Sequence, residues 1–222
     1  MTEVQQNLAK IREQLPANVQ LVAVSKFHPA EMIQQCYEQG QRIFGESHEQ
    51  ELRIKVPSLP KDIEWHFIGH LQTNKLKLVL PFASLIQSID SIRLLEAINN
   101  WGLNNDRSIN VLLELHLGAE ETKNGLEEAE IREILVRSAE YEHIVFRGLM
   151  GMATNTSDET IIRADFDRIS RLKSDLKKEF PELRQFNELS IGMSGDYRIA
   201  LEYGATIIRI GTNIFGPRKI SE

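Results

Sequence analysis

Eight short apolar segments recur along this 222-residue chain, and a stretch of helical character follows seven of them. The segments are rich in valine, isoleucine, leucine and phenylalanine and are bounded by glycine, proline or polar residues, which is typical of strands buried on both faces. We expect strands at 19–25, 42–45, 64–69, 84–88, 109–117, 144–150, 188–191 and 206–210. Regular alternation of strands and helices indicates right-handed crossovers between parallel strands.

Eight such units in this length predict a (β/α)8 barrel of the TIM type, formed by residues 1–222 as one domain. An extra amphipathic helix is expected at 2–15, ended by Pro16, before the first strand. The open Rossmann-like sheet is the alternative fold, and it is weakened because no G-x-G-x-x-G motif follows the first strand. The other helices are expected at 29–39, 46–56, 72–80, 91–101, 126–140, 158–179 and 196–203.

Composition argues against several classes of protein. The net charge is -6 and the pI is about 5.6, without a block of lysine and arginine, which argues against a nucleic-acid partner. No apolar run is long enough to span a membrane, and the N-terminus does not resemble a signal peptide. Cys36 is the only cysteine, and His66 and His70 lack a third ligand, so no metal site is expected. We therefore expect a cytoplasmic protein.

Lys26 ends the first apolar segment. A lysine at the end of a buried strand can direct its amine to a semi-buried rim, where desolvation lowers the amine pKa and favours attack on a carbonyl. The alternative is a lysine that extends its amine into solvent. Strand geometry alone favours the second interpretation.

Two glycine-containing loops follow the seventh and eighth strands, at residues 192–196 and 211–218. These are the loops that bind phosphate in many TIM barrels. The hydroxyl of Ser194 is expected to cap the following helix and face an anion, while the glycines allow close backbone approach. Ordinary tight turns are the alternative, but two such loops at the two expected positions favour a phosphate site.

Arg209 is expected to point into the barrel, because strand alternation places it on the same face as Ile207. A charge in that position needs a ligand or a partner, such as a glutamate at the barrel floor. A reactive amine, a phosphate-binding pair of loops and an inward cation together match a ligand with an aldehyde and a phosphate. Pyridoxal 5′-phosphate (PLP) has this layout, with a ring nitrogen to face the arginine.

Six segments carry a resemblance to a known family: 21–26 (LVAVSK), 42–46 (RIFGE), 64–75 (EWHFIGHLQTNK), 147–150 (RGLM), 189–196 (LSIGMSGD) and 209–218 (RIGTNIFGPR). In these segments the chain resembles the pyridoxal phosphate homeostasis proteins, the YggS/PROSC family, whose fold is similar to the barrel domain of alanine racemase. The resemblance implies that Lys26 carries PLP as a Schiff base and that Arg209 faces the pyridine nitrogen. It also implies a phosphate site formed by Ser194, Gly211 and Thr212, with Gly192 and Met193 shaping it.

Some positions depart from the family pattern. Ser47 stands where the family usually has an asparagine close to the ring, and Phe27-His28 lacks a second lysine that the family often has. Lys123 matches a lysine-x-glycine element of the family, although a solvated loop lysine is an equal alternative. His66 is a candidate for the barrel mouth near the ring.

The resemblance implies a monomeric PLP carrier of intracellular PLP homeostasis that passes the cofactor to PLP-dependent apo-enzymes, with no catalytic residue. An arginine beside the ring nitrogen disfavours its protonation, which weakens the ring as an electron sink. We also expect no second domain of the kind that completes the alanine racemase site. Two alternatives stay open: a PLP-dependent enzyme such as a low-activity amino-acid racemase, and a Schiff-base aldolase barrel without PLP.

Overall fold

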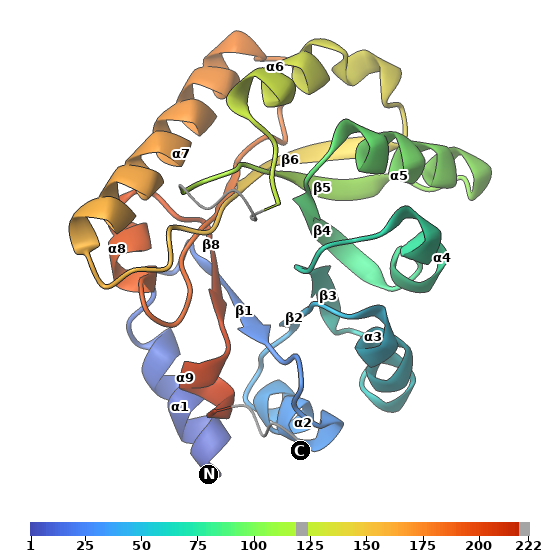
Figure 1. Cartoon of the computed structure of the whole chain (residues 1–222). Helices are drawn as coiled ribbons and strands as arrows, with labels where there is room; N and C mark the ends of the chain where they lie inside the picture. Colours follow the sequence, from blue (N-terminus) through green and yellow to red (C-terminus); the bar gives the residue numbers. More distant parts are fainter. Residues whose placement is uncertain (119–123, 218–222) are drawn as a thin grey trace.

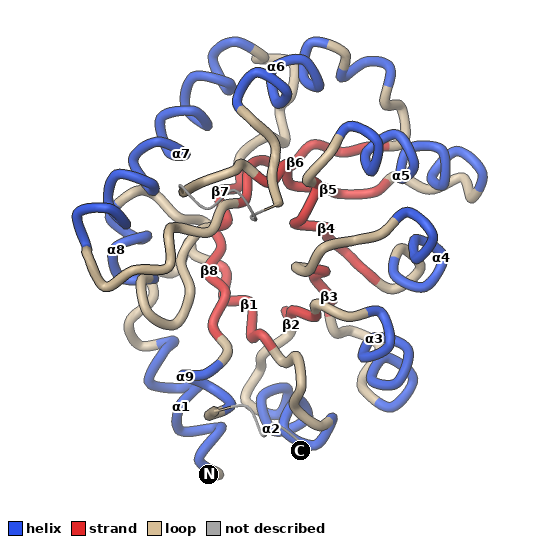
Figure 2. The backbone as a smooth tube through the Cα atoms, in the orientation of Figure 1, coloured by secondary structure: helices blue, strands red, loops and turns tan. Residues whose placement is uncertain are grey.

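The strands close into a parallel barrel in the computed structural model, which describes residues 1–118 and 124–217 (Figures 1 and 2). Neighbours in the barrel follow the chain order, and β8 pairs with β1, as in the register Val22 to Arg209. The (β/α)8 prediction is confirmed, and the open Rossmann-like alternative is wrong. The strands are β1 (Gln20–Val24), β2 (Ile43–Glu46), β3 (Glu64–Phe67), β4 (Ala83–Ile89), β5 (Ile109–Glu114), β6 (Ile144–Met150), β7 (Glu188–Ser190) and β8 (Ile207–Ile210).

Helices surround the barrel, and the expected N-terminal helix is present (Figure 1). The α-helices are α1 (Glu3–Arg12), α2 (Ala30–Glu38), α3 (Glu49–Lys55), α4 (Leu76–Val79), α5 (Ile92–Asn104), α6 (Glu128–Val136), α7 (Glu159–Glu179), α8 (Tyr197–Glu202) and α9 (Thr212–Phe215). The 3-10 turns are η1 (Val56–Ser58), η2 (Thr73–Lys75) and η3 (Ser138–Glu140). The helix expected at 72–80 is therefore a 3-10 turn followed by a single turn of α-helix.

The sequence did not predict α9, because four residues are too few to show a helical period. This helix packs beside α1, where Asn7 Nδ2 donates to the carbonyl oxygen of Ile214 at 3.3 Å. The N-terminal helix therefore supports the segment that follows β8. Among the described residues, no helix combines the length and the apolar character that a membrane crossing requires.

Two apolar layers result from the alternation of side chains along the strands. The larger layer lies between strands and helices, whereas a small cluster fills part of the barrel interior: Val22, Val24, Leu85, Leu112, Met150 and Ile207. The inward position of Ile207 is as expected. Polar side chains are also buried on these strands, including His66, Gln87, Ser190 and Arg209.

Gly148 pairs with Glu188 where β6 lies beside β7, and its φ is +149°. A methyl group there would collide with the carbonyl oxygen of Glu188. We expect Gly148→Ala to lower the free energy of unfolding by more than about 3 kcal/mol, measured by urea denaturation. Gly204→Ala is the control, because Gly204 has a φ of +79° but open space around it, and it should cost only about 1 kcal/mol. Equal losses in the two variants would contradict this account.

Candidate functional site

A cavity of about 250 Å³ opens at the carboxyl ends of the strands. Lys26 is half-buried and lies two residues beyond the end of β1, and its side chain lines this cavity together with Arg209 from β8. Both strands lie side by side at the point where the barrel closes. The complete lining is Val24, Lys26, Ile68, Met150, Met152, Met193, Ser194, Gly195, Arg209, Gly211 and Thr212.

The loops after β7 and β8 supply the hydroxyls of the cavity, from Ser194 and Thr212. The two loops are tied together, because Asn213 Nδ2 donates to the carbonyl oxygen of Ser194 at 2.9 Å. Small residues lie beside each hydroxyl, Gly195 in one loop and Gly211 in the other. An anion in this part of the cavity would meet two hydroxyls with little side-chain obstruction.

Ser194 does not cap the helix that follows, which corrects the sequence prediction. That helix, α8, begins at Tyr197, and the residue before it is Asp196. The carboxylate of Asp196 instead accepts the backbone N–H of Met193 at 2.6 Å and closes the loop. Gly192 does not line the cavity; it has a φ of +92° and lets α8 approach, since a Cβ would lie 2.6 Å from Ala200 Cβ.

Arg209 is buried, and backbone carbonyls and a hydroxyl solvate its guanidinium. One nitrogen donates to the carbonyl oxygen of Ser190 at 2.8 Å and to its hydroxyl at 2.6 Å, and another donates to the carbonyl oxygen of Gly151 at 3.0 Å. No carboxylate of the described residues forms an ion pair with it, so the salt bridge weighed as an alternative is absent from this part of the chain. Burial lowers the pKa of Arg209 to about 10, which leaves the group positively charged at neutral pH.

A directed chain of hydrogen bonds runs from Arg209 to His66 inside the barrel. The Ser190 hydroxyl donates to Gln87 Oε1 at 2.6 Å, and Gln87 Nε2 lies 2.8 Å from His66 Nδ1. Because an amide nitrogen can only donate, His66 Nδ1 must accept, and the imidazole carries its proton on Nε2. Burial lowers the pKa of His66 to about 3, so this ring is neutral. His66, expected near the barrel mouth, does not line the cavity; hydrogen bonds through Gln87 and Ser190 connect it to Arg209, which does.

Sequence reasoning thus placed six of the cavity's lining residues at one site and missed others. Ser47, half-buried after β2, is outside the lining and packs its backbone against Gly69. Gln87 and Ser190 were missed, although each is a polar residue next to an apolar residue within its strand, and that is a signal of an inward polar group. The expectation for Lys123 falls outside the described residues.

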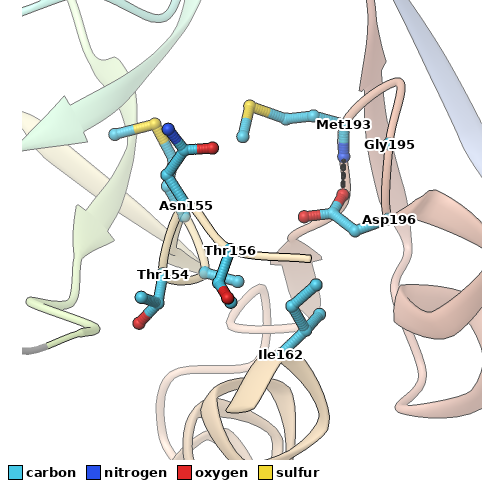
Figure 3. Close-up of a pocket in the computed structure, with 9 residues that line it drawn as sticks. Thr154, Asn155, Thr156, Ile162, Met193, Gly195 and Asp196 are labelled. Carbon is cyan, nitrogen blue, oxygen red and sulfur yellow. Dashed lines mark hydrogen bonds between the residues drawn. The ribbon is translucent and has the colours of Figure 1, made fainter. Parts of the chain in front are cut away.

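A second cavity, of about 300 Å³, adjoins the first and shares Met152, Met193 and Gly195 with it. Figure 3 shows Asn155 on one side of it and Met193 with Asp196 on the other. The dashed line marks the bond between Met193 and Asp196 that closes the β7 loop. The exposed Met193 side chain therefore lies between the two spaces.

Comparison with known proteins identifies relatives along the whole chain. The profile of the family described as alanine racemase, N-terminal domain, matches residues 1–219. A protein of Vibrio alginolyticus named pyridoxal phosphate homeostasis protein is 36% identical over 236 residues, which cover 100% of both chains. A human protein of the same name is 37% identical over 232 residues, covering 99% of this chain and 84% of the human one.

Solved structures agree with this grouping. PipY of Synechococcus elongatus, solved without PLP, has a TM-score of 0.92 and 36% identity, covering 96% of this chain and 100% of PipY. The structure of PipY with PLP bound has a TM-score of 0.88 at the same identity and coverage. Alanine racemase from Corynebacterium glutamicum is 13% identical with a TM-score of 0.72, so it shares the fold; this chain covers 61% of it.

The tautomer and charge of His66 can be measured by NMR of protein labelled with 15N-histidine, with His66→Asn to assign the signals. We expect a neutral ring with its proton on Nε2 down to pH 5. The folded pKa lies below the ordinary 6.5, so the stabilisation from keeping His66 neutral is present above about pH 6.5 and is lost as the pH falls towards 3. Protonation of the His66 ring to a cation above pH 5, or a neutral ring with its proton on Nδ1, would contradict the direction given to the hydrogen bonds between Arg209 and His66.

Proposed function

This chain belongs to the family of the pyridoxal phosphate homeostasis proteins, built on the alanine racemase N-terminal barrel, and we propose that it binds PLP for intracellular PLP homeostasis. The observation that carries the proposal is a single cavity that joins an amine, a buried guanidinium and two loop hydroxyls. These groups come from Lys26, Arg209, Ser194 and Thr212. They match the aldehyde, the ring nitrogen and the phosphate of PLP.

The lining also fits the remainder of the cofactor. Val24, Ile68 and the methionines supply apolar contacts suited to a pyridine ring, while Gly195 and Gly211 keep the phosphate end open. A Cβ at Gly211 would lie 3.3 Å from the carbonyl oxygen of Val24, so a larger residue there would press on the strand that leads to Lys26. The residues present therefore fit PLP at each of its parts.

Lys26 is the proposed point of covalent attachment, as a Schiff base. Bound PLP supplies an aldehyde for this linkage and a ring that stabilises carbanions best when its nitrogen is protonated. Arg209 opposes that protonation, because its guanidinium is charged and is fixed by Ser190 and Gly151. The site is therefore better suited to holding PLP than to turning over an amino acid.

We further propose a cytoplasmic monomer that passes PLP to PLP-dependent apo-enzymes. The four polar groups that match PLP all lie on this one chain. The names of the relatives support a role in homeostasis.

Attachment is tested by adding PLP to the wild type and to Lys26→Ala and recording the Schiff-base absorbance. We expect a yellow wild type and no such absorbance in Lys26→Ala. Borohydride reduction followed by peptide mapping should place the label on Lys26, and Lys10→Ala, on the outer helix α1, serves as the control. A wild type that stays colourless with PLP would refute the proposal, and alanine racemisation that is lost in Lys26→Ala would favour an enzyme.

The phosphate end is tested by the variant with both Ser194→Ala and Thr212→Val, using PLP and its unphosphorylated counterpart pyridoxal. Each hydroxyl that binds an anion is worth about 1.5 kcal/mol, so we expect the affinity for PLP to fall by about 100-fold. The affinity for pyridoxal should not change. Ser174→Ala, on the exposed face of α7, is the control, and equal losses for both ligands would place the phosphate elsewhere.

A further inference from the structure

A buried ionic cluster lies on the outer side of β1 and β2, between these strands and α3. Lys55, the last residue of α3, is buried, and its amine has three acceptors: Glu51 Oε1 at 2.7 Å, Glu46 Oε1 at 2.8 Å and the carbonyl oxygen of Ser25 at 2.9 Å. These three hydrogen bonds use all three N–H donors of the Lys55 ammonium group. Glu46, at the end of β2, is fully buried.

The cluster holds the backbone on both sides of Lys26. On one side, Ser25 receives a bond from Lys55 at its carbonyl oxygen, and its hydroxyl donates to Glu46 Oε1 at 2.6 Å. On the other side, the backbone N–H of Phe27 donates to Glu51 Oε1 at 2.7 Å. The residue before Lys26 is thus bonded to Lys55 and Glu46, and the residue after it to Glu51, all within one cluster.

The turn that carries Lys26 has an unfavourable backbone conformation. Phe27 has a φ of +65°, a left-handed backbone conformation that residues other than glycine, asparagine and aspartate seldom adopt. Phe27 is 50% exposed, so burial of the residue does not account for this conformation. Strain of this kind persists when surrounding contacts over-determine it, and the bond from Phe27 N–H to Glu51 is such a contact.

Stability alone does not explain why the cluster is buried. Removing charges from water is costly, and apolar residues of similar size often replace a buried ion pair without loss of stability. The cost is visible at Glu46, where burial raises the pKa to about 7 although Lys55 opposes the shift. A role in positioning the turn that carries Lys26 is a reason for burying the cluster despite this desolvation cost.

We propose that Lys55, Glu46 and Glu51 are positioning residues for Lys26, which hold the turn of residues 25–27 so that the amine enters the cavity. The inference rests on the proposed function, in which Lys26 attaches to PLP. None of the three side chains lines the cavity, so they act through the backbone of the turn. The cluster and the cavity therefore lie on opposite faces of β1.

Glu51→Ala and Glu51→Gln separate positioning from folding. Alanine removes the acceptor of the Phe27 N–H, whereas glutamine keeps an oxygen for it. We expect Glu51→Ala to slow Schiff-base formation with PLP by about tenfold and Glu51→Gln to restore the rate to within about twofold. The affinity for pyridoxine 5′-phosphate, which has an alcohol in place of the aldehyde, should match the wild type in both variants.

Lys75→Met is the matched control. The Lys75 amine lies 2.7 Å from Oε1 of Glu49, the first residue of α3, and this ion pair does not include the turn of residues 25–27. Lys55→Met is a second test with the same expected pattern as Glu51→Ala, in protein whose thermal unfolding shows that it is folded. Equal rates in Glu51→Ala and wild type, or parallel losses for PLP and pyridoxine 5′-phosphate, would overturn the inference. A wild type that forms no Schiff base would instead refute the proposed function.

Discussion

A single buried cation organises the interior of this barrel. Arg209 has no ion-pair partner among the described residues, so neutral groups solvate its charge: the carbonyls of Ser190 and Gly151 and the Ser190 hydroxyl. That hydroxyl then requires Gln87, and Gln87 requires an acceptor on His66. The orientation of these interior polar groups therefore follows from one guanidinium, and the apolar cluster with Val22 and Ile207 lies beside them. Each hydrogen-bonded group fixes the orientation of the next, which holds the Arg209 guanidinium in one position at the cavity.

Local sequence patterns were sufficient to predict the architecture. All eight strands lie where apolar runs indicated them, because strands covered by helices are apolar on both faces. The ends of the elements were less well predicted: the strand expected at 109–117 ends at Glu114, and α9 was missed. Strand ends depend on which backbone groups still find a partner in the neighbouring strand, and that is a tertiary property.

The site was predicted as far as its residues follow from strand order and loop composition. Lys26, Arg209 and the loops with Ser194 and Thr212 reach one cavity because β7, β8 and β1 are neighbours. The cap expected from Ser194 failed because Asp196, closer to the helix, closes the loop first. The cluster of Lys55 with Glu46 was not predicted, since it joins a helix to the outer face of two strands.

Closure of the barrel between its first and last strands has a consequence for biosynthesis. Lys26 leaves the ribosome long before Arg209 and Thr212, and these residues meet only when β8 docks beside β1. A nascent or truncated chain therefore has the amine without the groups that would retain a ligand beside it. Occupancy of the cavity thus reports that the chain has been made and folded at least as far as Thr212.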